Sequence, residues 1–333
     1  MADIRMLAPA STFSVPSTSA DHVPDKLPPT LRVQSIERHP GAHGGILNRA
    51  VLFHEQASLS VEWLTRHADI RLVRGSLASI RWLGRPVCCD GYIRISRLVL
   101  LERPEAAANL FSLVPRSWVS DRELVVRASA LWEGLPRGFR HLFNAMFWDG
   151  RRFQRYLMGP SSLGHHHSGL NGNFRHCIEV AERALRMAEG QELANRAILA
   201  IGGLVHDAGK ADEYRFDHVR RCFTMSDRGA LIGHRETLQQ WIAAAMASHR
   251  VILPEAHYLG LIHALIAAKG APAWLGLREP RSIEATILSM ADRLSGEEEL
   301  YTRLAPAKGG FGRYHRLLKY RPYVVGLGAG HGL

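Results

Sequence analysis

The chain shows two kinds of hydrophobic pattern, which divide it into a strand-rich part and a helical part. Within residues 48–103, apolar residues such as Leu59 and Val61 alternate with polar ones, a spacing typical of half-buried strands. Further along, apolar residues recur every three or four positions, as from Ile178 to Leu185, which is the pattern of amphipathic helices. We therefore predict a mainly α protein, in which a helical bundle follows a small β-barrel.

The same patterns suggest five segments. The first 47 residues are rich in Ser, Thr, Pro and Ala and show little periodicity, so we expect them to be disordered. The segments that we predict are a disordered tail (1–47), a β module (48–103), a helical connector (104–158), a helical domain that carries the candidate site (159–304) and a Gly- and Arg-rich C-terminal tail (305–333).

Composition narrows the class of protein. The 333 residues carry a formal net charge of +11, which favours a polyanionic partner without indicating any base specificity. The four cysteines, at positions 88, 89, 177 and 222, form neither a CxxC pair nor a disulfide framework, and this usage suits a reducing compartment. Because we find neither a long apolar run nor an N-terminal signal sequence, we expect a cytoplasmic protein that makes no use of a membrane.

Four ionisable residues stand in apolar helical segments. His206 and Asp207 are adjacent, His176 lies early in an apolar-periodic segment, and Asp292 lies on a predicted helix whose other residues are largely apolar. A buried carboxylate without a partner is costly, and imidazole together with carboxylate suits divalent first-row metals. We therefore predict a metal site held by these four side chains, although a single histidine on an apolar helix is more often a structural residue.

The order His176, His206-Asp207, Asp292 resembles the HD superfamily of metal-dependent phosphohydrolases, over about residues 140–300. Within it, the YhaM-type 3′-5′ exoribonucleases have similar motifs at 166–176, 204–210 and 228–234. The TraI-like domain of MobH-type conjugative relaxases is similar around residues 160–167. The resemblance implies an all-helical HD-domain bundle and, by analogy with YhaM, an OB-like fold for the β module.

Two positions depart from the family pattern. Asn171 replaces the first glycine of a Gly-Gly pair, and Asn tolerates a left-handed backbone better than most residues. Ala268 and Lys269 stand where the exonuclease pattern has further histidines. A second metal would therefore depend on His234 and His263, and a one-metal site is an alternative.

The activity implied is metal-dependent phosphodiester hydrolysis on nucleic acid, most like a 3′-5′ exonuclease on single-stranded RNA or DNA. Manganese is the first choice of metal, with Fe, Co, Mg or Zn as alternatives. Lys210 is placed to bind a phosphate oxygen, and His166 or His167 to position the phosphate or protonate the leaving oxygen. The alternatives are a relaxase or nickase of a conjugative element, a nucleotide phosphohydrolase, and a catalytically impaired nucleic-acid-binding adaptor.

Arginines and aromatic residues are interleaved in the predicted β module. They could form a basic groove with stacking platforms for a single strand, or an ordinary solvated face over an aromatic core. The residues that we select as nucleic-acid contacts are Arg71, Arg74, Arg81, Trp82 and Arg94. The oligomeric state is left open.

Overall fold

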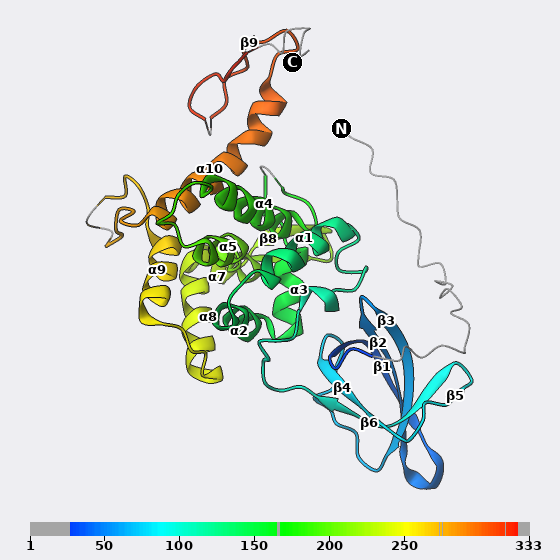
Figure 1. Ribbon diagram of the computed structural model, residues 1–333. Helices are drawn as coiled ribbons and strands as arrows, with labels where there is room; N and C mark the ends of the chain where they lie inside the picture. The colour runs from blue at the N-terminus through cyan, green and yellow to red at the C-terminus, as the bar shows by residue number, and fades with distance from the viewer. Residues whose placement is uncertain (1–26, 165–166, 273, 275, 317, 326–333) are drawn as a thin grey trace, which may run out of the picture.

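The computed structural model describes residues 27–164, 167–272, 274, 276–316 and 318–325, and contains a β module beside a helical domain (Figure 1). The predicted order, strands first and helices afterwards, is confirmed. The strands of the module are β1 (Leu31–Pro40), β2 (Ile46–His54), β3 (Ala57–Thr65), β4 (Leu77–Trp82), β5 (Cys88–Cys89) and β6 (Tyr92–Leu100). Short 3-10 helices lie at Ala42–Gly44 (η1) and Phe111–Leu113 (η2).

The six strands form one sheet in the order β3-β2-β1-β4-β6-β5, in which these neighbours are antiparallel. A further parallel pairing joins β3 to β6, with Val61 opposite Ile93. The inward residues of the strands, such as Leu52 and Ile95, are buried in a core of their own. The alternation that predicted strands therefore reflects one buried and one outward face.

The prediction of a disordered tail over residues 1–47 is wrong for residues 31–47, which include β1 and the start of β2. Leu31 and Val33 are buried against the rest of the sheet. A register shift between Val33 and Ser35 then moves the next apolar contact to Ile36. This irregularity breaks the two-residue alternation of apolar and polar residues, so the alternation in β1 is too short to indicate a strand. Residues 1–26 of the predicted tail lie outside the described part of the chain.

The helical domain begins after β6 and contains two short hairpins. Its helices are α1 (Arg122–Glu133), α2 (Arg137–Phe147), α3 (Gly150–Met158), α4 (Gly172–Met187), α5 (Arg196–Val205), α6 (Lys210–Glu213), α7 (Asp227–Leu231), α8 (His234–His249), α9 (Glu255–Ile266) and α10 (Ile283–Leu304). One hairpin pairs β7 (Tyr214–Asp217) with β8 (Cys222–Met225), and the other pairs β9 (Gly310–Phe311) with β10 (Tyr323–Val324). Among the described helices, none combines the length and the apolar composition that crossing a membrane would require.

Helix α5 lies at the centre of this domain, packed against α4, α9 and α10. Every residue from Ile198 to Val205 is buried, as expected for a helix that is apolar on all sides. Gly203 permits the close approach of α4, because a Cβ atom at this position would lie 2.4 Å from the Ala181 Cα. This contact packs the end of α5 against α4, and the predicted site residues His176 on α4 and His206 at the C-cap of α5 lie on these two helices.

Arg32 of β1 connects the β module to the helical domain. Its side chain is fully buried and donates from Nε to the Leu113 carbonyl and from Nη1 to the Gly75 carbonyl, both at 2.8 Å. The guanidinium also lies 4.8 Å from the Trp118 ring centroid and 5.4 Å from that of Phe153. Burial lowers the pKa of Arg32 to about 9, so the side chain stays charged at neutral pH. The two parts of the protein are thus joined by a buried cation.

Candidate metal centre

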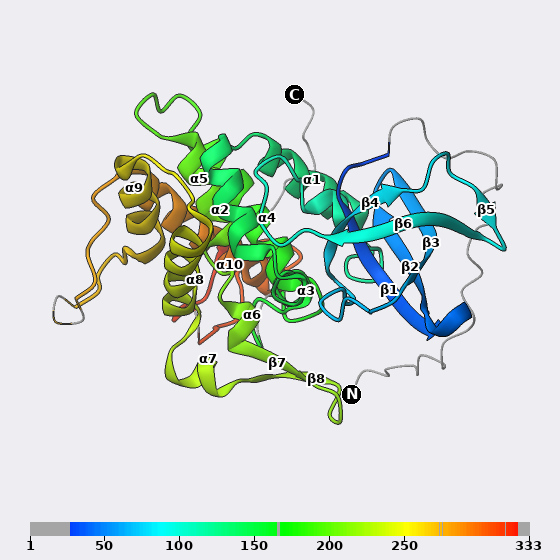
Figure 2. The same cartoon turned by 90° about the horizontal axis from the view of Figure 1, so that it is seen from below.

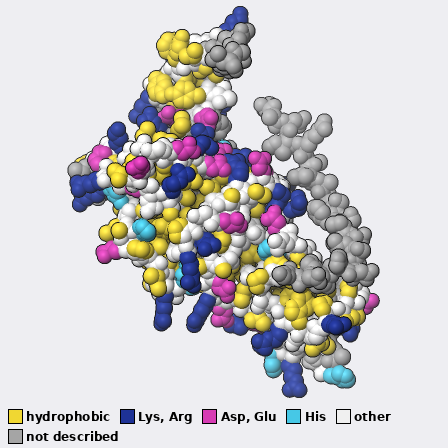
Figure 3. All heavy atoms as spheres, viewed as in Figure 1, with side chains coloured by type: hydrophobic (Ala, Val, Ile, Leu, Met, Phe, Trp, Pro, Cys, Tyr) yellow, Lys and Arg dark blue, Asp and Glu magenta, His cyan; other side chains and the backbone are white. Residues whose placement is uncertain are grey.

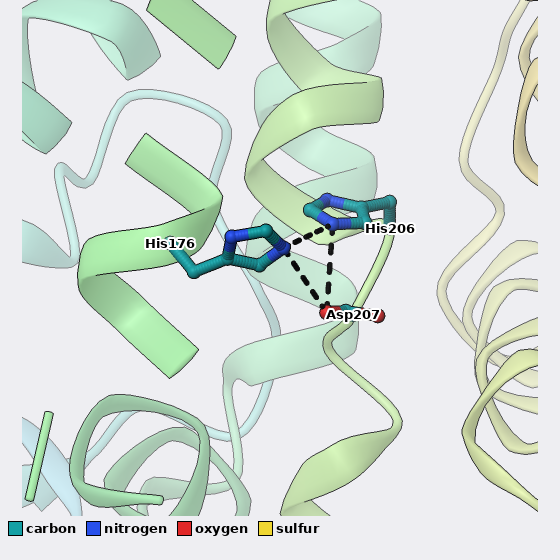
Figure 4. A group of neighbouring side chains, drawn as sticks. All are labelled: His176, His206 and Asp207. Carbon is teal, nitrogen blue, oxygen red and sulfur yellow. Dashed lines mark hydrogen bonds and ion pairs between the residues drawn. The ribbon is translucent and has the colours of Figure 1, made fainter. Parts of the chain in front are cut away.

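Four side chains from three separate helical segments converge at one point. His176 lies on α4, His206 caps the C-terminal end of α5 and is followed by Asp207, and Asp292 lies on α10. Figure 4 shows His176, His206 and Asp207 directed toward one another. The His176 Nε2 lies 3.2 Å from the His206 Nε2, 3.1 Å from the Asp292 Oδ1 and 3.4 Å from the Asp207 Oδ2. The structure therefore brings together the four residues that we predicted to hold a metal.

The second nitrogen of each imidazole is engaged away from this point. The His206 Nδ1 lies 2.9 Å from the Gly203 carbonyl oxygen, which can only accept a hydrogen bond, so Nδ1 carries the proton. The His176 Nδ1 lies 3.2 Å from the Ser295 hydroxyl. In the neutral rings, this arrangement leaves the Nε2 lone pairs for the common point. Metal-binding histidines are held in the same way in proteins generally.

The spacing of the donor atoms matches that required by one metal ion. Two donors bound at about 2.1 Å are about 3.0 Å apart at a right angle and about 3.4 Å apart at a tetrahedral angle. The His206 Nε2 lies 3.5 Å from both the Asp207 Oδ2 and the Asp292 Oδ1, and the three separations from the His176 Nε2 are slightly shorter. Two imidazoles and two carboxylates also suit Mn, Fe, Co or Zn. The residues present thus fit a divalent metal.

Charges around the cluster favour a cation at this point. Burial alone would lower the pKa of His206, but the Asp207 and Asp292 carboxylates outweigh burial and raise that pKa well above its ordinary value. Burial alone would raise the pKa of Asp207, yet the Lys210 ammonium and the neighbouring imidazoles hold it well below its usual range. Burial alone would also raise the pKa of Asp292, but the His176 and His206 imidazoles hold it well below its usual range, so both carboxylates are ionised at neutral pH. The potential that favours a proton on His206 equally favours a divalent ion in its place.

Two residues behind His176 were missed by the sequence analysis. The Ser295 hydroxyl, besides contacting His176, donates to the Glu179 Oε2 at 3.3 Å. Glu179 also lies 3.3 Å from the His167 Nε2, so His167 is linked to the cluster through this chain of contacts. A helical signal was available, because Glu179 follows His176 by three positions and Ser295 follows Asp292 by three. Residues at this spacing share a helix face.

A second histidine site lies on the other side of Asp207. The His234 Nε2 is 3.4 Å from the Asp207 Oδ1, and its Nδ1 is 2.7 Å from the Glu213 Oε2. Glu213 was also missed by the sequence analysis. Gly209 makes this approach possible, because a Cβ atom there would lie 2.0 Å from the His234 carbonyl oxygen. The Lys210 Nζ lies 2.5 Å from the Asp207 Oδ2, so this predicted catalytic lysine adjoins the cluster as well.

Other predicted site residues lie elsewhere. His263 is on α9, where its Nε2 accepts a hydrogen bond from the Arg281 amide at 2.8 Å. Among the described residues, the printed contacts of His263 and His234 do not join these two side chains, so the geometry adds no support to the second metal that we predicted on this pair. His166 lies outside the described residues. Asn171 adopts the left-handed conformation that we anticipated, with φ 61°.

The five predicted nucleic-acid contacts are spread over the β module rather than grouped. Arg71 forms ion pairs with Asp69 and Glu102, and Trp82 packs against the core of the sheet. Arg74 and Arg81 are exposed, and Arg94 pairs with Glu62 at 3.3 Å.

A compact row on the outward face of the sheet was not anticipated. Arg49, Glu62 and Arg94 lie side by side on β2, β3 and β6. Glu62 pairs with both arginines at 3.3 Å. The Arg49 guanidinium also lies 4.5 Å from the Tyr92 ring centroid. The partly exposed Arg49 and Tyr92 and the exposed Arg94 thus meet around the buried Glu62 carboxylate on these three strands.

Comparison with known proteins agrees with the geometry of the cluster. The family profile described as "HD domain" matches residues 173–297, a range that contains all four converging residues. One relative is the 3′-5′ exoribonuclease YhaM of Bacillus licheniformis, which is 27% identical over 169 residues, or 51% of this chain and 50% of the relative. Another is the 3′-5′ exoribonuclease YhaM of Geobacillus sp. WCH70, which is 27% identical over 150 residues, or 45% of each chain. The YhaM protein of Bacillus pumilus is 26% identical over 169 residues, again 51% of this chain and 50% of the relative.

The chain spans about half the length of the curated relatives that it matches. No solved structure matches it significantly. The range matched by the family profile contains the whole cluster. Residues 173–297 of this chain therefore form an HD domain, and the chain is a homologue, at modest identity, of the YhaM 3′-5′ exoribonucleases.

Proposed function

We propose that this protein is a metal-dependent phosphodiesterase acting on nucleic acid, most like a 3′-5′ exonuclease on single-stranded RNA or DNA. The observation that carries the proposal is the convergence of two imidazole Nε2 atoms with the Asp207 carboxylate, beside which the Asp292 carboxylate contacts both imidazoles, within an HD domain. The names of the relatives support a nucleic-acid substrate. The direction of cleavage is likewise inferred from them.

In this proposal, His176, His206, Asp207 and Asp292 hold the metal, with manganese as the first choice and Fe, Co, Mg or Zn as alternatives. A bound divalent ion would polarise a phosphoryl oxygen and lower the pKa of a water molecule. Lys210 brings a positive charge to the edge of the cluster, where it can bind a non-bridging phosphate oxygen.

Two histidines beside the cluster are placed for proton transfer. His167 is held by Glu179 and His234 by Glu213. Each carboxylate orients the imidazole that it contacts. Either histidine can therefore donate a proton to the leaving oxygen, provided that the oxygen lies within hydrogen-bond reach.

The β module supports a role in binding a single strand. Following the strand pairings from β1 through β2, β3, β6 and β4 leads back to β1, and β3 is parallel to β6. This circular order favours the OB-like barrel that we predicted. OB folds bind oligonucleotides on their second and third strands and adjoining loops. Here β2 and β3 carry Arg49 and Glu62, and Arg94 lies beside Glu62 on β6. The net charge of +11 and the basic side chains distributed over both parts of the protein (Figure 3) favour a polyanionic ligand.

The test combines metal analysis with digestion of labelled strands. Elemental mass spectrometry of the purified protein is expected to find about one or two equivalents of metal. An Asp207→Ala variant is expected to lose the metal, whereas an Asp227→Ala variant, altered at an exposed position on α7, keeps it. No metal in the wild type, even after reconstitution with Mn²⁺, would contradict the proposal.

Substrate topology then separates the alternatives. A 3′-5′ exonuclease shortens a 5′-labelled linear strand stepwise and leaves a circular strand intact, because it needs a free end. Opening of the circle would instead favour a relaxase or nickase. Binding of both substrates without cleavage would favour a catalytically impaired adaptor. Parallel RNA and DNA substrates identify the nucleic acid.

A further inference from the structure

The β7–β8 hairpin extends from the helical domain directly beside the cluster. In Figure 2 it projects from α6 and α7, away from the other helices. Each of its strands has four residues, which corresponds to a length of about 13 Å. Such a short two-stranded element contributes little to the core, so its exposed side chains need a different explanation.

One face of the hairpin is aromatic and apolar. Tyr214 pairs across the strands with Met225, and Phe216 pairs with Phe223. The two phenylalanine rings meet edge to face, with centroids 5.2 Å apart. Phe216 is 41% exposed and Met225 is 43% exposed. The outer part of the hairpin thus presents an aromatic ring to solvent at a fixed position.

The tip of the hairpin is basic. Arg220 and Arg221 are exposed, and Arg215 is exposed on the opposite face of β7. The acidic residue of the turn, Asp217, accepts hydrogen bonds from the Val219 and Arg220 amides and so holds the turn together. The arginines therefore give the hairpin a net positive charge close to its exposed aromatic side.

The base of the hairpin is fixed to the candidate metal centre. Tyr214 directly follows Glu213, whose carboxylate holds His234 at 2.7 Å. On the other strand, Met225 is followed by Ser226, whose amide donates to the Glu213 carbonyl at 2.9 Å and whose hydroxyl donates to the Asp212 carbonyl at 2.6 Å. The aromatic face thus begins beside the cluster and leads outward from it.

We infer that this hairpin is a binding element for a single strand of nucleic acid, in which Phe216 stacks against an unpaired base and Arg220 and Arg221 bind the phosphate backbone. Aromatic rings stack with any base, and basic side chains follow the backbone without reading sequence. An unpaired strand fits better than a duplex, because paired bases do not expose a free face to Phe216. The inference rests on the proposed function, since it places the scissile phosphate at the cluster.

Binding can be measured separately from hydrolysis. Fluorescence anisotropy with a fluorescein-labelled 12-nucleotide strand, in EDTA, reports affinity without cleavage. The test variant is Phe216→Leu, which keeps an apolar contact with Phe223 but removes the aromatic ring. The matched control is Phe311→Leu, because Phe311 is an exposed phenylalanine in the other hairpin, with its ring centroid 4.9 Å from that of Tyr323. Phe216→Tyr should retain stacking.

We expect Phe216→Leu to weaken single-strand binding about tenfold, as the loss of one stacked base implies, and Phe216→Tyr and Phe311→Leu to change it less than about twofold. A 2-aminopurine base in the strand should lose its stacking-induced quenching in Phe216→Leu alone. A duplex of the same sequence should bind wild type and Phe216→Leu equally. Replacing both Arg220 and Arg221 with Ala should reduce the salt dependence of binding.

Equal binding by Phe216→Leu and Phe311→Leu would overturn the inference, as would no single-strand binding by the wild type or an equal loss on duplex. These outcomes differ from failure of the proposed function, which would appear as absence of metal and of hydrolysis in the wild type. The small substrate bis(p-nitrophenyl) phosphate carries no strand, so its hydrolysis by the wild type tests the metal centre separately from the hairpin. Hydrolysis of this substrate together with no single-strand binding would overturn the inference and leave the proposed function standing.

Discussion

Replacing Ser295 with Ala tests whether the contacts behind His176 hold it in position for a metal. Ser295 is 2% exposed, and its hydroxyl lies 3.2 Å from the His176 Nδ1 and 3.3 Å from the Glu179 Oε2. The substitution removes both interactions but leaves all four candidate ligands in place. Loss of such an orienting partner lowers metal affinity about 10- to 100-fold, which corresponds to about 1.4 to 2.8 kcal/mol.

Calorimetric titration of the metal-free protein with Mn²⁺ measures this effect. Ser289→Ala is the matched control, since Ser289 is exposed on the same helix and should leave the affinity unchanged. Thermal unfolding of both metal-free variants shows whether the fold is retained. If Ser295→Ala binds Mn²⁺ as tightly as Ser289→Ala does, then His176 does not depend on Ser295 for its orientation and the reasoning fails.

Two further substitutions test the packing that positions the site. Arg32→Ala should lower the free energy of unfolding by about 3 kcal/mol, because it removes two buried hydrogen bonds from a charged group, one to Gly75 within the β module and one to Leu113 of η2 in the helical part. Arg38→Ala removes two hydrogen bonds made by an exposed guanidinium on the same strand and should cost less than about 1 kcal/mol. Chemical denaturation measures both, and equal effects would refute the role given to Arg32. Gly209→Ala should destabilise the protein by about 1 to 3 kcal/mol, since its Cβ would lie 2.0 Å from the His234 carbonyl oxygen. Gly169→Ala, where no atom lies within 4 Å, should be nearly neutral in the same thermal-unfolding assay, and a neutral Gly209→Ala would show that α8 can shift without cost.

The four converging residues could be predicted because their chemistry contrasts with their surroundings. His176, His206, Asp207 and Asp292 stand in segments whose periodicity indicates a buried face, where ionisable groups need partners. Sequence could not supply the distances among them, which depend on how α4, α5 and α10 pack. The contact between Gly203 and Ala181 sets part of that packing.

The supporting residues were harder to recognise. Ser295, Glu179 and Glu213 are residue types that are common on exposed helix faces, so their identity alone gave no signal. His263 presented the opposite case, because it has the chemistry of a ligand but lies on α9, where it contacts the Arg281 amide. Residue type therefore predicted which groups could bind a metal, and tertiary structure decided which of them meet.

Strand periodicity was informative only where the strands are regular. The alternation of Leu59, Val61 and Trp63 predicted β3 correctly, and all three side chains are buried. In β1 the register shift after Val33 interrupts the alternation, and the polar remainder of the strand resembled a tail. The irregular backbone of β1 therefore explains why its sequence pattern did not predict a strand.

The parallel pairing of β3 with β6 also has a consequence for association between molecules. Because of it, each of the five long strands has a strand neighbour on both sides. An open sheet edge displays unpaired amide and carbonyl groups that recruit strands from other chains, and closure removes that template. Where these strands are paired, a partner therefore meets side chains rather than main-chain hydrogen-bonding groups, which disfavours edge-to-edge aggregation of this basic protein at those positions and leaves recognition to its surface residues.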